Sequence, residues 1–165
     1  CIRDSIITLV QLYRFNNVPF KAAELLENAI DQGSVVATEQ HLEMLAQSYI
    51  AAKNEQKAIP ALIKASLISE TGKIDAQLAQ VYMNIERWQL AIDSADSALL
   101  REGLNRTGDM HLILGMSYFN LKKYDQALIS FEAAKAVASS AKSAEQWAKY
   151  VKREQGQQAR LAMLN

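Results

Sequence analysis

The 165-residue chain has a single cysteine, two prolines and six glycines. One cysteine rules out a disulfide within the chain, and so few helix breakers in a half-apolar sequence favour one helical domain. No apolar run approaches the roughly 18 residues that a membrane-spanning helix needs. The chain begins with Cys1 instead of methionine, which predicts that it is a segment of a longer protein.

An excess of one charge is also missing, since 18 basic residues balance 18 acidic ones. Nucleic-acid binders usually carry a basic excess or stripe, so this balance argues against a nucleic-acid partner. The two histidines, His41 and His111, lie far apart in sequence, and neither has a second ligand at metal-binding spacing. There is no glycine-rich phosphate loop, and Cys1 has no evident base to activate it. We therefore predict no enzyme activity, no metal site and no cofactor.

What the sequence does contain is an internal repeat. Tyr118 is followed nine residues later by Ala127 and sixteen later by Ala134, and these residue types recur at the same offsets upstream. Counted back from the last copy, the spacings are 36, 33 and 36 residues, which places the other tyrosines at Tyr82, Tyr49 and Tyr13. Each period has room for two helices and a turn, so the chain is expected to stack helix pairs.

The fourth copy, "LGMSYFNLKKYDQALISFEAAK", shows how a pair is built. One helix is expected over about 109–121 and a second over about 124–138. Gly115 lies inside the first helix, where glycine costs about 1 kcal/mol relative to alanine. We expect Gly115 to face Ala127 across the antiparallel pair, because small residues at that crossing let two backbones come close.

This pattern resembles the tetratricopeptide repeat, a two-helix repeat of about 34 residues. In the fourth copy the match is carried by Leu114, Gly115, Tyr118, Tyr124, Ala127, Phe131 and Ala134. The resemblance implies an all-α, right-handed α-solenoid of four helix pairs in residues 1–140, with repeats at about 3–36, 39–71, 72–105 and 108–140. The chain departs from the family at the first-turn tryptophan, whose places hold Ile6, Leu42, Asp75 and His111.

Residues 141–165 leave the pattern and are expected to form a C-terminal capping helix, because a solenoid needs a terminal element over its last apolar face. Ser143 followed by Gln146 has the form of a capping box. The helix would have one apolar face, made by Trp147, Tyr150 and Val151. A basic nucleic-acid surface is the alternative, but five basic against two acidic residues is too small a surplus. The apolar end of this helix is also a candidate contact with a second copy.

In tetratricopeptide repeats, the first helix of each pair lines a groove that holds a peptide or a helix. Carried onto this chain, the resemblance implies a peptide-binding groove made by Ile7, Gln11, Arg14, Phe15, Met44, Gln47, Lys73, Gln77, Gln80, Met83, Asn84, Met116, Phe119 and Asn120. Glutamine amides offer a donor and an acceptor to a bound backbone, and methionine adapts to varied apolar partners. Packing between repeats is an equal explanation for some apolar members, Phe119 among them.

The expected function is therefore a non-enzymatic scaffold that binds a protein or peptide partner. Some members of the family bind the C-terminal carboxylate of chaperones through a clamp of Lys, Asn and Arg side chains. Only Lys73 matches a residue of that clamp, so the C-terminal tail of a chaperone is excluded as the partner. The alternative is a regulatory region of a larger enzyme or assembly factor whose other domains lie outside this sequence.

A narrower resemblance concerns location. The stretches "KAIPALIKAS", "LILGMSYFNLKKYDQAL" and "AEQWAKYV" are similar to bacterial periplasmic repeat proteins encoded with TonB–ExbB–ExbD systems. This resemblance implies a periplasmic protein that is accessory to a TonB-type transport system. A cytoplasmic location is the alternative.

Overall fold

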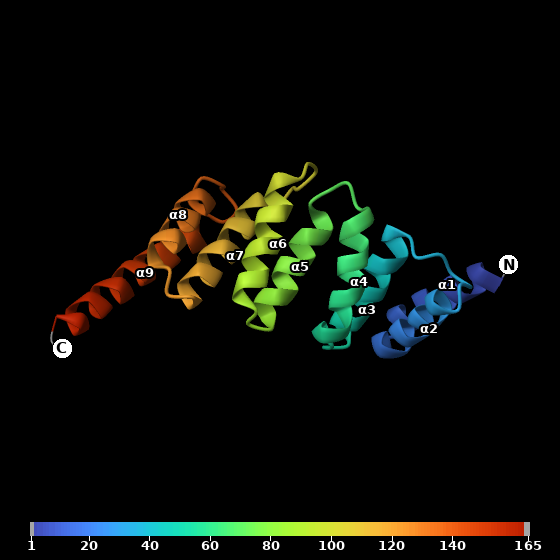
Figure 1. The fold of residues 1–165 in the computed structure, drawn as a ribbon. Helices are drawn as coiled ribbons and strands as arrows, with labels where there is room; N and C mark the ends of the chain where they lie inside the picture. The colour runs from blue at the N-terminus through green and yellow to red at the C-terminus, as the bar shows by residue number, and fades with distance from the viewer. Residues whose placement is uncertain (1, 164–165) are drawn as a thin grey trace. The chain divides into compact units, whose positions relative to one another are not determined.

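The computed structural model describes residues 2–163. Cys1, with which the predicted first repeat domain begins, and Leu164 and Asn165, with which the predicted capping helix ends, lie outside the described residues. Nine α-helices and no strand occur in the described part of the chain (Figure 1). The all-α repeat fold expected from the sequence is confirmed.

Eight of these helices form consecutive pairs joined by short turns. The pairs are α1 (Ile2–Phe15) with α2 (Pro19–Asp31), α3 (Glu39–Ala51) with α4 (Glu55–Ile68), α5 (Lys73–Asn84) with α6 (Trp88–Leu100), and α7 (Thr107–Asn120) with α8 (Tyr124–Lys135). The ninth helix, α9, runs over Ala141–Ala162.

The chain divides into two compact units, Cys1–Glu70 and Thr71–Asn165. In the first unit, α1 packs on α2, α2 on α3, and α3 on α4. In the second unit, α5 packs on α6, α6 on α7, α7 on α8, and α8 on α9. Each unit therefore holds two whole helix pairs, and the second also holds α9.

All four turns within the pairs have the same backbone geometry. One residue in each turn has a positive φ of 57° to 59°, namely Asn17, Lys53, Glu86 and Lys122. The next N–H donates to the carbonyl oxygen of the repeated tyrosine, at 2.8–2.9 Å, as in Val18 to Tyr13 and Lys123 to Tyr118. This back-bond belongs to a Schellman-type helix end. The repeated tyrosine thus marks where the first helix of each pair stops.

The repeated alanines line the core of each pair. Ala22, Ala58, Ala91 and Ala127 are fully buried, and so are Ala65, Ala98 and Ala134. Gly115 is buried as well, but its close neighbour differs from the expected one. A Cβ atom at position 115 would lie 2.5–2.7 Å from three ring atoms of Phe131. Gly115 therefore makes room for the Phe131 ring, and not chiefly for Ala127.

Helix α9 packs on α8 and begins earlier than the capping box implies. Its N-cap residue is Ser140, so the predicted cap at Ser143 is wrong. The Ser140 hydroxyl is buried and donates to the Ala134 carbonyl at 2.6 Å, which satisfies a backbone group at the end of α8. Trp147 of α9 stacks on Phe131 with 5.9 Å between ring centroids and 8° between ring planes.

No helix in residues 2–163 is both long and apolar enough to cross a membrane.

Candidate functional site

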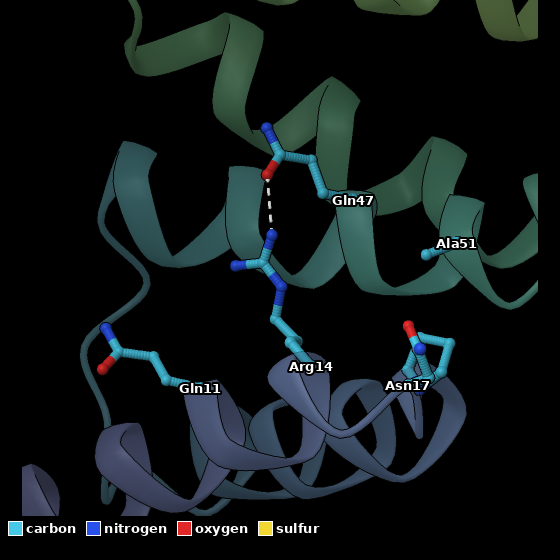
Figure 2. A pocket seen from close by; sticks show the side chains of 6 residues that line it. Gln11, Arg14, Asn17, Gln47 and Ala51 are labelled. Atoms are coloured by element: carbon cyan, nitrogen blue, oxygen red, sulfur yellow. Dashed lines mark hydrogen bonds between the residues drawn. The ribbon is translucent and has the colours of Figure 1, made fainter.

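The first unit has an open pocket of about 530 Å³ between α1 and α3, here called the N-terminal pocket (Figure 2). Its lining residues are Gln11, Arg14, Asn17, Pro19, Gln47 and Ala51. Gln11, Arg14 and Gln47 are among the groove residues expected from the sequence. The structure therefore brings together three predicted residues from two different repeats.

Hydrogen bonds inside the chain already occupy the N-terminal pocket. Arg14 Nη2 donates to Gln47 Oε1 at 3.1 Å, as Figure 2 shows, and Gln47 Nε2 donates to Glu43 Oε1 at 3.0 Å. The Gln47 amide thus donates one bond and accepts one bond within the chain, which is half of the bonding capacity of an amide. Where a ligand replaces one of these bonds, the net gain from the new hydrogen bond is reduced.

The second unit has a larger pocket of about 590 Å³, here called the central pocket. It is lined by Thr71, Lys73, Ala76, Gln77, Gln80, Gly103, Leu104, Asn105, Arg106, Asp109 and Met110. Lys73, Gln77 and Gln80 are predicted groove residues, and all three come from α5. The remaining lining residues come mainly from the loop after α6 and from the start of α7.

The central pocket combines an apolar floor with a polar rim. Met110 is buried, and Ala76 and Leu104 are half-buried. Lys73 and Gln80 are exposed at the rim, where Gln80 Nε2 donates to Asn84 Oδ1 at 2.8 Å. Arg106 is held by an ion pair with Asp109. This arrangement suits a ligand that buries a small apolar group while its polar atoms remain at the edge.

Three interactions shape the frame of the central pocket by joining the start of α5 to the end of α6 and the loop that follows it. Asp75 is only 3% exposed and accepts hydrogen bonds from Ser97 Oγ at 3.0 Å and from Arg101 Nε at 3.2 Å. Gly72 N–H donates to the Glu102 carbonyl at 3.2 Å, and a Cβ at Gly72 would collide with the Ala98 carbonyl oxygen. These contacts hold the loop after α6 against the start of α5, where the pocket lies.

A third hollow of about 440 Å³, the C-terminal pocket, lies between α7 and α9. Its lining residues are Phe119, Asn120, Ser143, Gln146, Trp147 and Tyr150. The Phe119 ring centroid lies 5.3 Å from that of Tyr150 and 6.1 Å from that of Trp147. Phe119 is thus part of an aromatic cluster that joins α7 to α9, as well as part of a pocket wall. The sequence interpretation had assigned no groove residue to α9.

The other predicted groove residues line none of these three pockets. Met83 and Met116 are half-buried and pack against the hydrophobic clusters of the second unit, which favours a packing role for both. Ile7 and Met44 are half-buried, Asn84 is exposed, and Phe15 is 86% exposed. The glutamines of the predicted groove are divided between the units, with Gln11 and Gln47 in the first unit and Gln77 and Gln80 in the second.

Each histidine lies near a group of its own part of the chain, His41 near a backbone carbonyl and His111 near a carboxylate. His41 follows the cap of α3, and its Nδ1 lies 2.7 Å from the Val36 carbonyl oxygen. Partial burial lowers the pKa of His111, and the neighbouring Asp96 carboxylate opposes that shift. Burial also raises the pKa of the Tyr49 phenol, whose hydroxyl donates to Glu27.

Within residues 2–163, no three His, Cys, Asp or Glu side chains lie close enough together to hold a metal ion.

Comparison with known proteins identifies the fold as that of tetratricopeptide repeats. Residues 76–144 match the family model described as tetratricopeptide repeat. Comparison with curated protein sequences finds no significant match.

Three solved structures illustrate the likeness. A MamA protein is 18% identical with a TM-score of 0.81, covering 94% of this chain and 83% of that one. MamA from Desulfovibrio magneticus RS-1 is 12% identical with a TM-score of 0.70, covering 95% and 97%. The TPR-like repeats of a putative kinesin light chain from Podosopora anserina are 20% identical with a TM-score of 0.67, covering 98% and 90%. At these identities the likeness establishes the fold alone.

Proposed function

This chain has the tetratricopeptide-repeat fold, and from that premise we propose that it is a non-catalytic scaffold that binds a segment of another protein in the central pocket. The observation that carries the proposal is the meeting of Lys73, Gln77 and Gln80 with the start of α7 around one hollow. The resemblance to the tetratricopeptide repeat implies a binding groove that includes the same three residues.

The size of the central pocket supports a peptide-sized contact. Its volume of about 590 Å³ lies within the range of about 300–1,000 Å³ that is common for ligand pockets. Such a pocket takes one or two side chains of a segment, while the rim amides bond to its backbone. Gln77 and Gln80 carry both donors and acceptors, which suits a backbone that presents N–H and C=O groups in turn.

The N-terminal pocket is a second candidate contact in the other unit, but it is a weaker one. None of its six lining residues is buried, so it has no apolar floor comparable to Met110 in the central pocket. The proposal therefore assigns the main binding energy to the central pocket, since a few residues usually dominate an interface.

The test is affinity capture of a partner from cells of the source organism, followed by a binding measurement with purified components. The double variant Lys73→Ala/Gln80→Ala should lose about tenfold or more in affinity, because losing about 1.4 kcal/mol of interface energy has that effect. Both side chains are exposed, so its stability should change by only about 0.5 kcal/mol.

The matched control is Gln126→Ala/Lys152→Ala, which removes the same two side-chain types from exposed places on α8 and α9. It should keep full affinity. If the control loses the partner and the pocket variant keeps it, the binding site lies elsewhere on the chain.

The narrower proposal, a periplasmic role beside a TonB-type transport system, rests on the sequence resemblance. Recovery of a TonB, ExbB or ExbD component in the same capture experiment would support it. A set of exclusively cytoplasmic partners would contradict it.

A further inference from the structure

The C-terminal pocket between α7 and α9 has an uncharged lining. Its residues are three aromatic, two amide and one hydroxyl side chain. An ionised group of a ligand would lose its hydration there without meeting an opposite charge, which is costly. The Arg153 guanidinium lies 5.1 Å from the centre of the Tyr150 ring, so this ring already holds a cation, and Arg153 repels a second one. The C-terminal pocket therefore favours a neutral group.

The α9 side of the pocket is a row of polar groups with unused bonding capacity. Ser143, Gln146, Trp147 and Tyr150 have the i, i+3, i+4, i+7 spacing of one helix face. None of these four side chains makes a hydrogen bond within residues 2–163. The indole N–H of Trp147 reaches solvent, since Ser117 Oγ is the only buried side-chain polar atom without a partner in this part of the chain. A ligand that offers acceptors to this row breaks no bond inside the chain.

Three aromatic rings form the apolar wall of the pocket. Tyr150 is 39% exposed, and Phe119 and Trp147 are half-buried. The planes of these rings are inclined to one another by 57° to 87°. Their open parts therefore form an angled wall instead of one flat platform. Such a wall holds a compact apolar group that contacts two rings at once, whereas a flat base would stack on only one.

A proline-rich segment has the chemistry that this pocket lacks. Proline is neutral, its ring is compact, and it brings no N–H that needs an acceptor. The polyproline II helix has no internal hydrogen bonds, so its carbonyl oxygens are free to accept bonds from the row on α9. An α-helix would leave the same row unbonded, because its own N–H groups already use its carbonyls. Aromatic-lined grooves are a recurring docking site for polyproline II segments.

We propose that the C-terminal pocket binds a proline-rich segment of a partner protein in the polyproline II conformation. Its proline rings lie against Tyr150 and Trp147, and its carbonyl oxygens accept hydrogen bonds from Gln146 and from the indole N–H. The C-terminal pocket shares no lining residue with the central pocket. This site is therefore separate from the proposed function, and the two can fail independently.

The probe is decaproline with blocked ends, titrated into the isotopically labelled chain and followed by nuclear magnetic resonance. The chain has two tryptophans, Trp88 and Trp147, and therefore two indole N–H signals, which the variant Trp88→Phe assigns. The Trp147 signal should shift, while the Trp88 signal should not, because Trp88 lies on α6 outside the pocket. A glycine-serine peptide of equal length is the control and should shift neither signal.

Variants of the pocket make the test specific. Tyr150→Ala should weaken decaproline binding by about tenfold or more, because it removes one ring of the wall. Tyr150→Phe keeps the ring and should keep most of the affinity. Gln146→Ala, at an exposed place that bonds to nothing within residues 2–163, should fold normally and weaken binding by about threefold or more. Gln158→Ala is the matched control, exposed on the same helix, and should leave binding unchanged.

Four results would overturn the proposal. The first is an unmoved Trp147 signal at millimolar decaproline. The second is an equal response to the glycine-serine peptide, because proline rings would then not be recognised. The third is an affinity for decaproline that neither Tyr150→Ala nor Gln146→Ala changes. The fourth is a shift of the Trp147 signal with chitotetraose but not with decaproline, because the occupant would then be a sugar.

Discussion

At the scale of single residues, Gly115 sets helix propensity against packing. Glycine weakens α7 by about 1 kcal/mol relative to alanine, yet a methyl group there would lie 2.5–2.7 Å from the ring of Phe131. None of the other copies has this aromatic ring, since the places equivalent to Phe131 hold Ala95, Leu62 and Leu26. In the fourth pair, the missing Cβ of Gly115 on α7 leaves room for the aromatic ring of Phe131 on α8.

Gly115→Ala should destabilise the chain by about 1–3 kcal/mol, because overpacking a dense core outweighs the gain in propensity. Gly156→Ala is the control, since a Cβ there meets nothing closer than 4.0 Å. That change should stabilise α9 by up to about 1 kcal/mol. Urea unfolding of both variants measures the difference. Equal stabilisation by the two alanines would show that the Phe131 ring moves aside freely and that the close-packing account is wrong.

The sequence predicted where small residues occur, but not all of their neighbours. The offsets of Gly115 and Ala127 indicated a close crossing, whereas the identity of the facing side chain depends on helix rotation and on the Phe131 rotamer. The left-handed turn residues were also not predictable, because they are one asparagine, one glutamate and two lysines, at Asn17, Glu86, Lys53 and Lys122, and none is the glycine that favours a positive φ. Asp75 was noted only as a departure from a family pattern, and its buried bonds to α6 emerged from the structure.

At the scale of helices, α9 has two halves with different surroundings. In its first half Ala144, Ala148 and Val151 are buried against the fourth pair. Gln155 Nε2 then donates to Asp125 Oδ1 at 2.9 Å. Beyond it, residues 157–163 are exposed and extend past α8 (Figure 1). Only the first half can contribute substantially to the stability of the fold.

Two truncations should separate these halves. Removing residues 157–165 should leave the melting temperature nearly unchanged, because exposed residues contribute little to folding. Removing residues 141–165 should cause aggregation or a clear loss of stability, since Phe131 and Ala134 would lose their cover. Thermal unfolding and light scattering measure both effects. A soluble and equally stable chain without residues 141–165 would show that α9 is an appendage.

The sequence predicted α9 as a helix within residues 141–165 but misplaced its capping residue. The Ser143 and Gln146 pair has the spacing of a capping box, and such spacing also occurs by chance inside a helix. The residue that precedes the helix is Ser140, and its hydroxyl serves the end of α8 instead of the start of α9. That role depends on a tertiary contact, which no local pattern records.

At the scale of the whole molecule, the predicted groove residues belong to two compact units. The repeat spacing was sufficient to place Lys73, Gln77 and Gln80 on one side of α5. It was not sufficient to predict the central pocket, because the loop after α6 forms part of its wall and loops follow no repeat. The C-terminal pocket depends likewise on the docking of α9, which lies outside the repeats.

The central claim is that a protein segment binds in the central pocket, and site-specific photo-cross-linking tests it most directly. A photoreactive phenylalanine analogue replaces Gln80 in one protein and Gln126, on the exposed side of α8, in another. Each protein is irradiated with the captured partner, and the cross-linked products are identified by mass spectrometry. We predict efficient cross-linking from position 80 and little from position 126. Cross-linking from position 126 with none from position 80 would contradict the claim.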